Sequence, residues 1–287
     1  MRPMSFIGSM GICSEMFHWR HRLIGSGRCV VVWRNQRWLI LGASGGIGEA
    51  LGEQMARKGA RLLLASRSPT PCRAEGFTYV RIDLASEDVE AQMADICQRY
   101  PDIDGVIHCA GQGLFAAVEQ TPLQELERLW RVNLRSAYAV ARCFSSYFRQ
   151  RGHGELVFIG STFGSIGFPG YSAYCATKFA LRGLTEALRR EWADSGIAVR
   201  YIAPRATKTG MNSPAVVAMN RALGNRSDSP EAVAFAIVRT IERKRGRRYL
   251  GWPERLFVAV NNLIPAVVDT ALRRKLSIIQ SYLKSEY

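Results

Sequence analysis

The stretch RWLILGASGGIGEALGEQMARKG, residues 37–59, decides the fold. It starts with an apolar run of strand length at residues 37–41, and its second half carries apolar residues at helical spacing. Glycines separate the two parts, which is typical of a tight turn. The stretch therefore predicts a buried strand that leads through a turn into an amphipathic helix beginning near Gly46.

The turn contains Gly42, Gly46 and Gly48 in the spacing G-x-x-x-G-x-G, with Ser44 and Ile47 between them. Glycines allow the backbone to turn sharply and to approach a pyrophosphate, whose charge meets the free N–H groups and positive end of the following helix. Glycine clusters also form ordinary turns. Because a strand precedes this cluster and a helix follows it, we interpret it as a dinucleotide-binding loop.

Short apolar runs recur along the chain, each followed by a turn or by a longer segment with helical spacing. Strands that are buried on both faces have such continuous apolar runs, and their alternation with helices indicates βαβ units. We predict an α/β fold with a doubly wound parallel sheet, and we expect the chemical residues beyond the carboxyl ends of its strands. The runs are residues 37–42, 60–66, 78–83, 104–110, 154–160 and 197–203.

Length and composition favour a single domain, because the 287 residues are 47% hydrophobic and no Pro/Gly/Ser-rich linker divides them. We expect a poorly ordered extension at 1–36, such that deletion up to Arg34 leaves fold and activity intact. The main domain then covers 37–252, and an amphipathic helical extension covers 253–287. Seven cysteines without ligand spacing indicate a reduced, cytoplasmic protein with neither a disulfide framework nor a metal site.

The net charge of +15 comes from basic residues that gather at the two ends of the chain. No nucleic-acid motif accompanies them, so we predict no nucleic-acid partner. The charge is instead a weak indication of anionic ligands or anionic lipid.

The second strand run ends in Ser66 and Arg67, at a point where NAD-binding units carry an acidic residue that grips the ribose hydroxyls. A guanidinium suits a 2′-phosphate, so the sequence favours NADP over NAD. The other interpretation of Arg67 is a solvated loop arginine. Asp83, which closes the third run, either meets the adenine edge or caps the next helix.

Tyr174 and Lys178 stand four residues apart at the start of another helical segment, so they are stacked neighbours on one face. Such a pair is often a surface lysine whose stem covers a ring. The alternative is chemical: an ammonium one turn away lowers the pKa of the phenol and makes the tyrosine a general acid and base.

Further motifs accompany this pair in order: HCAG at 108–111, RVNL with Asn133, and IGS with Ser161 thirteen residues before Tyr174. With the glycine loop, they make the sequence resemble the short-chain dehydrogenase/reductase family, the small single-domain and NADP-preferring kind, over residues 37–243. The resemblance implies a Rossmann-type sheet and the tetrad Asn133, Ser161, Tyr174 and Lys178. It also implies that Ser161 and Tyr174 bond the substrate oxygen, that Lys178 lowers the pKa of Tyr174 and holds the ribose, and that Asn133 anchors a water.

The resemblance assigns a wider set of residues to the cofactor. These residues are Gly42, Ser44, Gly46, Ile47, Gly48, Ser66, Arg67, Asp83, Ala110, Gly111, Tyr174, Lys178, Pro204, Thr207 and Thr209.

The sequence departs from the family pattern at two places. His108 and Cys109 replace two asparagines, and we interpret both as packing residues. Arg205 replaces a glycine after Pro204, where it contacts a phosphate or an acidic substrate group, or else points to solvent. Thr209 follows, at the position where the family meets the nicotinamide carboxamide.

Apolar residues near the C-terminus indicate a hydrophobic substrate or simple packing of a substrate lid. In the lid region these are Met211, Val216, Val217, Met219 and Leu223. One or two amphipathic helices around Pro265 then place Leu256, Val260, Leu263, Val267, Val268 and Leu272 on common faces. Arg273, Arg274 and Lys275 follow, so these helices either seal a pocket or a subunit interface, or lie on an anionic membrane.

The resemblance therefore implies an NADP(H)-dependent oxidoreductase. It would transfer hydride between nicotinamide and the carbonyl or secondary alcohol of a hydrophobic ketone, aldehyde, 3-oxoacyl or sterol-like substrate, as a homodimer or homotetramer. The alternative is a non-catalytic NADP-binding interaction or regulatory protein on the same fold, which the substitutions at Arg205, His108 and Cys109 favour.

Overall fold

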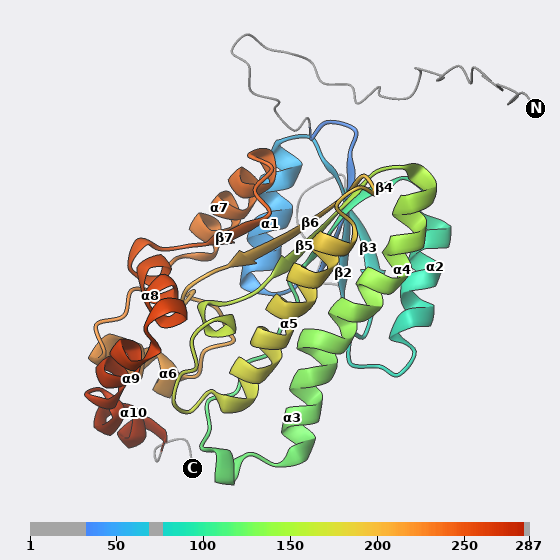
Figure 1. Cartoon of the computed structure of the whole chain (residues 1–287). Coiled ribbons are helices and arrows are strands. Elements are labelled where there is room, and N and C mark those ends of the chain that lie inside the picture. The colour runs from blue at the N-terminus through green and yellow to red at the C-terminus, as the bar shows by residue number, and fades with distance from the viewer. Residues whose placement is uncertain (1–32, 69–76, 284–287) are drawn as a thin grey trace, which may run out of the picture.

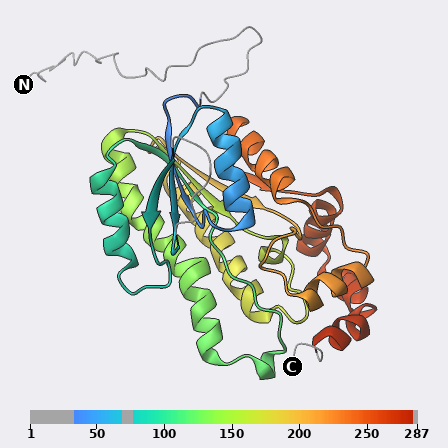
Figure 2. The same cartoon turned by 180° about the vertical axis from the view of Figure 1, so that it is seen from behind.

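Seven parallel strands form one sheet in the order β3-β2-β1-β4-β5-β6-β7. The computed structural model describes residues 33–68 and 77–283, and Figures 1 and 2 show the sheet between two layers of helices. The strands are β1 (Arg37–Leu41), β2 (Arg61–Ser66), β3 (Phe77–Arg81), β4 (Ile103–His108), β5 (Gly154–Ile159), β6 (Ile197–Ala203) and β7 (Arg247–Tyr249).

The first six strands confirm the predicted runs, and the seventh was missed. β7 has three residues and pairs with β6 from Tyr201 opposite Arg247 to Ala203 opposite Tyr249. Two of its three residues are arginines, so it lacks the apolar run that identified the others. We had expected this part of the chain to continue directly into helices.

Helices cover both faces of the sheet, as the doubly wound prediction required. One face carries α1 (Gly46–Arg57) and α7 (Pro230–Glu242), and the opposite face carries α2 (Val89–Arg99), α4 (Ser136–Arg151) and α5 (Ser172–Glu191). The remaining α-helices are α3 (Leu123–Trp130), α6 (Pro214–Ala222), α8 (Trp252–Leu263), α9 (Pro265–Arg273) and α10 (Leu276–Leu283).

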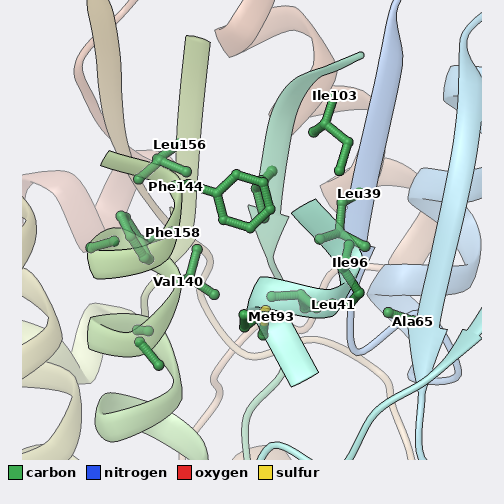
Figure 3. Packing of buried hydrophobic residues seen from close by; sticks show 14 of the residues in the cluster. Leu39, Leu41, Ala65, Met93, Ile96, Ile103, Val140, Phe144, Leu156 and Phe158 are labelled. Carbon is green, nitrogen blue, oxygen red and sulfur yellow. The ribbon is translucent and has the colours of Figure 1, made fainter. Parts of the chain in front are cut away.

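Alternating residues of β1 contribute to the two halves of the core. Leu39 and Leu41 pack with residues of α2 and α4, whereas Trp38 and Ile40 pack with residues of α1 and α7. Figure 3 shows the first half, where Phe144 of α4 lies among side chains from the sheet and from α2. Burial on both faces explains why the strands are continuously apolar rather than alternating.

The order of the strands indicates at which edge of the sheet a ligand binds. From β1 the chain moves outward to β2 and β3, and then it crosses back to β4 on the other side of β1. In open α/β sheets, ligands bind in the crevice that this reversal leaves at the carboxyl ends of the two central strands. β1 ends here at Leu41 and β4 ends at His108, and these two residues are paired.

Trp33 belongs to the core, which corrects the expectation that deletion up to Arg34 leaves the fold intact. Its side chain is buried, its ring lies 5.3 Å from that of Trp38, and Nε1 donates to Glu242 Oε1 at 3.0 Å. Removing a buried tryptophan typically costs about 3–5 kcal/mol. The predicted extension at 1–36 otherwise falls on residues 1–32, outside those described.

Three helices, rather than the expected one or two, follow β7. The chain bends by 119° between α8 and α9, with Pro265 in the first turn of α9, where its missing N–H is tolerated. Val268 is buried, whereas Leu256, Leu263 and Val267 are exposed, so the apolar residues do not share one packed face. Within the described ranges no single helix is long and apolar enough to span a membrane, and only the bent pair reaches that length and composition.

Candidate functional site

Tyr174 and Lys178 lie one turn apart on α5, as predicted. Lys178 is 3% exposed, and its ammonium lies 5.7 Å from the centre of the Tyr174 ring. Nζ also donates to the carbonyl oxygen of Ile159, the last residue of β5, at 3.2 Å. The pair therefore faces the carboxyl end of a central strand, and the interpretation as surface decoration is wrong.

Burial, rather than the ammonium, dominates the acidity of Tyr174. Displacement of water by the surrounding side chains raises the pKa of Tyr174 to about 12, and a hydrogen bond with Ser161 acts in the opposite direction. Lys178 lies over the ring, and its Nζ bonds the carbonyl oxygen of Ile159. The lowering of the Tyr174 pKa by Lys178 stays a prediction.

Burial also acts on Lys178, whose pKa it lowers to about 8. A neighbouring residue, Cys109, acts in the opposite direction. The pKa of Lys178 therefore lies close to neutral pH.

Ser161 follows β5 directly and caps a short 3₁₀ helix, Thr162–Gly164. Its Oγ accepts from Phe163 N at 3.1 Å, and the carbonyl oxygen of Ser161 accepts from the Tyr201 hydroxyl at 3.2 Å. These contacts fix the serine beside Tyr174.

Asn133 is fully buried in a π-helical turn, Arg131–Arg135, between α3 and α4. Its Nδ2 donates to Gln112 O at 2.9 Å and to Thr177 Oγ1 at 3.0 Å, and its Oδ1 accepts from Gln112 N at 2.8 Å. Such π turns inside helices frequently occur at functional sites. Gln112 and Thr177 were not singled out in the sequence, and their only signal is adjacency to Gly111 and Lys178.

Gly111 connects the asparagine to the lysine. A Cβ atom placed on Gly111 would lie 3.3 Å from Lys178 Nζ and 3.4 Å from Asn133 Oδ1. The structure therefore brings together all four residues of the predicted tetrad at one edge of the sheet.

The glycine loop lies at the same edge and requires its glycines. Gly42 has φ +82°, and a Cβ there would lie 2.6 Å from Ala110 Cα. A Cβ on Gly48 would lie 2.2 Å from Gly42 O, and one on Gly46 would lie 3.1 Å from Thr209 Cγ2. α1 begins at Gly46 without a side-chain cap, so its first N–H groups are open to an anion. These features fit the pyrophosphate of a dinucleotide, with Ser44 exposed and Ile47 half-buried in the loop.

Residues at the ends of β2 and β3 lie where the adenosine half of a dinucleotide would be held. Ser66 is buried and its Oγ donates to Ser68 O at 2.8 Å, whereas Arg67 is exposed. Asp83 Oδ1 accepts from Ala85 N at 3.0 Å, a local turn bond. Because α2 begins only at Val89, Asp83 does not cap that helix.

The loop after β6 is tied to the segment before α7. Pro204 O accepts from Thr162 N at 3.1 Å, and Thr207 is buried with its Oγ1 bonded to Arg205 O at 3.0 Å. Arg205 donates to Asp228 at 2.6 and 2.9 Å and lies 3.5 Å from Glu254. Its guanidinium is therefore paired with carboxylates of the chain itself, and the interpretation as a solvent-facing side chain is wrong. A contact between Arg205 and a ligand stays a prediction.

His108 is buried and Cys109 is half-buried against the core, in keeping with the interpretation of both as packing residues. His108 Nε2 lies 2.7 Å from Ser136 Oγ, and this hydroxyl donates to Val132 O at 2.6 Å, so Nε2 carries the hydrogen. Burial lowers the pKa of His108 to about 3 and raises the pKa of Cys109 to about 12, so both are neutral.

We expect His108 to make the fold sensitive to acid. Its pKa falls from the ordinary 6.5 to about 3 on folding, so between these values the unfolded chain binds the additional proton. Stability is therefore complete above about pH 6.5 and falls by about 1.4 kcal/mol per pH unit below it. The free energy of unfolding, measured by urea titration at about pH 7 and pH 4.5, should drop by about 3 kcal/mol more in the wild type than in His108→Asn. The partly exposed His153, changed to asparagine, is the control. An equal drop in wild type and His108→Asn would contradict the assignment.

Apolar side chains pack against Tyr174. The Phe163 ring stacks on Phe168 at 4.9 Å and lies 6.4 Å from the Tyr174 ring. Val216 and Met219 of α6 and Ile279 of α10 are buried in the same cluster. Of the five predicted lid residues, Val216, Met219 and Leu223 pack on the body, whereas Met211 and Val217 are about half exposed. Figures 1 and 2 show α6 and α10 together near the start of α5.

Comparisons with known proteins agree with this geometry. The family model for short chain dehydrogenases matches residues 36–219. An uncharacterized oxidoreductase of Mycobacterium tuberculosis is 30% identical over 233 residues, which are 76% of this chain and 88% of that protein.

Solved structures share the fold at low identity. A short chain dehydrogenase from Burkholderia cenocepacia in complex with NADP has a TM-score of 0.74 at 20% identity, over 84% of this chain and 99% of that one. A 3-ketoacyl-(acyl-carrier-protein) reductase from Brucella melitensis, complexed with NADH, has a TM-score of 0.69 at 22% identity, over 76% of this chain and 97% of that one. From the family model and the mycobacterial relative, which span most of the sheet and its flanking helices, this chain belongs to the short chain dehydrogenase family of oxidoreductases.

Proposed function

We propose that this oxidoreductase uses NADP(H) and reduces the carbonyl group of a hydrophobic substrate, or oxidises the corresponding secondary alcohol. The observation that carries the proposal is the convergence of Ser161, Tyr174, Lys178 and Asn133 beside a glycine loop whose geometry admits a pyrophosphate. A bound nicotinamide supplies the hydride.

Residues of the chain itself donate and return the proton. Tyr174 donates its phenolic proton to the carbonyl oxygen, and Ser161 holds that oxygen through a hydrogen bond. With a pKa raised to about 12, Tyr174 is protonated at neutral pH, which is the form that reduction needs. The buried ammonium of Lys178 holds the ribose hydroxyls, and Asn133 anchors the water that returns the proton.

The surroundings of Tyr174 support a hydrophobic substrate. Phe163, Phe168 and Tyr171 form an aromatic layer against the Tyr174 ring. Val216 and Met219 of α6 and Ile279 of α10 are buried in the same cluster. Ketones, aldehydes, 3-oxoacyl thioesters and sterol-like compounds match that lining.

Preference for NADP over NAD rests on Arg67. Its guanidinium follows β2, where family members that bind NAD carry an acid, and it is exposed to a ligand. Arg67→Ala should weaken NADPH binding by roughly 10- to 100-fold, because a charge-assisted hydrogen bond contributes about 1.5–3 kcal/mol, and should leave NADH binding nearly unchanged.

Fluorescence titration of both cofactors into wild type and Arg67→Ala measures this difference. Arg149→Ala, which removes an exposed arginine of α4, is the control and should bind both cofactors as the wild type does. Equal loss of NADPH and NADH affinity in Arg67→Ala would reject the role of Arg67.

The non-catalytic alternative loses part of its support with the ion pairs of Arg205, which turn that charge toward Asp228 and Glu254. A homodimeric or homotetrameric assembly, a cytoplasmic location and peripheral membrane contact through the C-terminal helices stay predictions.

A further inference from the structure

A cavity of about 240 Å³ lies between β7 and α8, apart from the tetrad and the glycine loop. Guanidinium groups dominate its walls. Its polar lining consists of Arg245, Arg247, Arg248, Tyr249, Arg255 and Asn262, and we call it the arginine pocket.

Most of the charge in the arginine pocket is not neutralised by carboxylates. Arg247 pairs with Glu186 at 2.6 Å. Across residues 33–68 and 77–283, no carboxylate forms an ion pair with Arg245, Arg248 or Arg255. The pocket therefore carries an excess of positive charge.

Repulsion between these positive charges affects the pKa of Arg248. Its pKa is lowered first by burial and then by the positive charges of neighbouring arginines. The arginines that act on it are Arg239, Arg243, Arg245 and Arg255. A bound anion relieves like-charge repulsion of this kind, and a planar guanidinium fork matches phosphate oxygens.

An exposed apolar surface begins on α8, which also lines the pocket, and continues onto α9. We call it the α8–α9 ridge, and it consists of Trp252, Leu256, Leu263, Ile264 and Val267, which are 72%, 54%, 81%, 58% and 54% exposed. The most exposed of them, Leu263, stands at the bend between α8 and α9. Exposed apolar side chains gathered in one patch mark an interaction surface.

The ridge and the arginine pocket occupy adjacent faces of α8. With about 3.6 residues per turn, Trp252, Leu256 and Leu263 share one face, and Arg255 and Asn262 lie roughly a quarter turn away. Val258, which lies on the side of α8 that faces away from the ridge, is buried against Ile166 and Val268. In Figures 1 and 2 these helices lie at the outer edge of the molecule, beside the β7 end of the sheet.

We propose that the arginine pocket and the α8–α9 ridge form one docking surface for a bilayer that contains anionic phospholipids. A headgroup phosphate enters the pocket, and the ridge inserts into the interface between headgroups and acyl chains. Charge complementarity decides for this occupant, because a second copy of the chain with the same face would bring another set of unpaired arginines against the first. Trp252 suits the interface between headgroups and acyl chains, because its ring is apolar and its N–H can stay near water.

Vesicle co-sedimentation of the full chain tests this surface without any turnover, so its result is independent of the proposed reaction. The chain should bind vesicles of phosphatidylcholine with phosphatidylglycerol, bind vesicles of phosphatidylcholine alone far more weakly, and detach as salt is added. Arg245→Gln/Arg255→Gln should lower the partition coefficient about 30-fold, since each arginine near an anionic surface contributes about fivefold. Leu256→Ser/Leu263→Ser should lower it about tenfold or more.

The matched control is Arg142→Gln/Arg149→Gln, which removes two exposed arginines of α4 on the opposite face of the sheet and should bind like the wild type. Equal thermal midpoints among the variants exclude unfolding. Three results would overturn the proposal: no binding to the anionic vesicles at low salt, equal losses in the two arginine pairs, or a mass that doubles with concentration and falls to that of a monomer in the leucine variant. If inorganic phosphate binds in the pocket but vesicles do not bind to the chain, the pocket is a site for a free anion.

Discussion

Tyr174→Phe should lower turnover by roughly 100- to 10,000-fold, the range expected when a general acid is removed. The hydroxyl is the only group lost, and the ring keeps its contacts with Phe163 and Tyr171. Cofactor affinity and thermal midpoint should therefore stay close to the wild-type values. Initial rates of NADPH consumption, with a fluorescence titration of NADPH on the same preparations, measure both effects.

Tyr138→Phe is the control for this experiment, because it removes the same atom from a tyrosine that is 57% exposed on α4 and does not belong to the tetrad. It should keep full turnover. A Tyr174→Phe protein that turns over within a few-fold of the wild type would show that the proton comes from another group.

Gly48→Ala should abolish cofactor binding and destabilise the fold by about 3 kcal/mol, at the upper end for a forced steric clash. The new Cβ would lie 2.2 Å from Gly42 O and 2.9 Å from Ala43 Cα. Both neighbours are backbone atoms, so the loop must move away from the position that a pyrophosphate needs. NADPH titration and urea unfolding measure the two losses.

Gly52→Ala, one turn further along α1, is the matched control. A Cβ there meets Leu64 Cδ2 at 3.5 Å, which is an ordinary contact, and alanine is the better helix former by about 1 kcal/mol. This variant should bind NADPH normally and be as stable as the wild type or more so. Equal behaviour of the two alanine variants would contradict the role given to Gly48.

The sequence was sufficient for most of the fold because the signals were local. Runs such as GELVFIG at 154–160 are buried on both faces of a parallel sheet, and that environment selects continuous apolar residues. β7 was missed because its pairing with β6, and not its composition, makes it a strand. Trp33 was assigned to a dispensable segment because the sequence does not show its contacts. Glu242 lies 209 residues away along the chain, and no pattern in the sequence indicates that Trp33 packs on Trp38.

The candidate site was predicted where spacing alone fixes geometry, as for Tyr174 and Lys178 on one helix face. It was not predicted where tertiary contacts decide. Arg205 stands beside the loop that holds Thr209, yet its carboxylate partners come from positions 228 and 254. The rise in the Tyr174 pKa was missed for the same reason, since it comes from burial, which spacing in the sequence does not reveal.

The most direct test of the central claim combines cofactor binding with turnover in the unmodified chain. NADPH and NADH are titrated into the purified protein, and loss of NADPH absorbance is then followed with aliphatic, aromatic, 3-oxoacyl and steroid carbonyls. We expect tighter binding of NADPH and carbonyl-dependent oxidation of it by at least one hydrophobic substrate. Failure of both cofactors to bind would contradict the account of the glycine loop, and with it the proposed reaction.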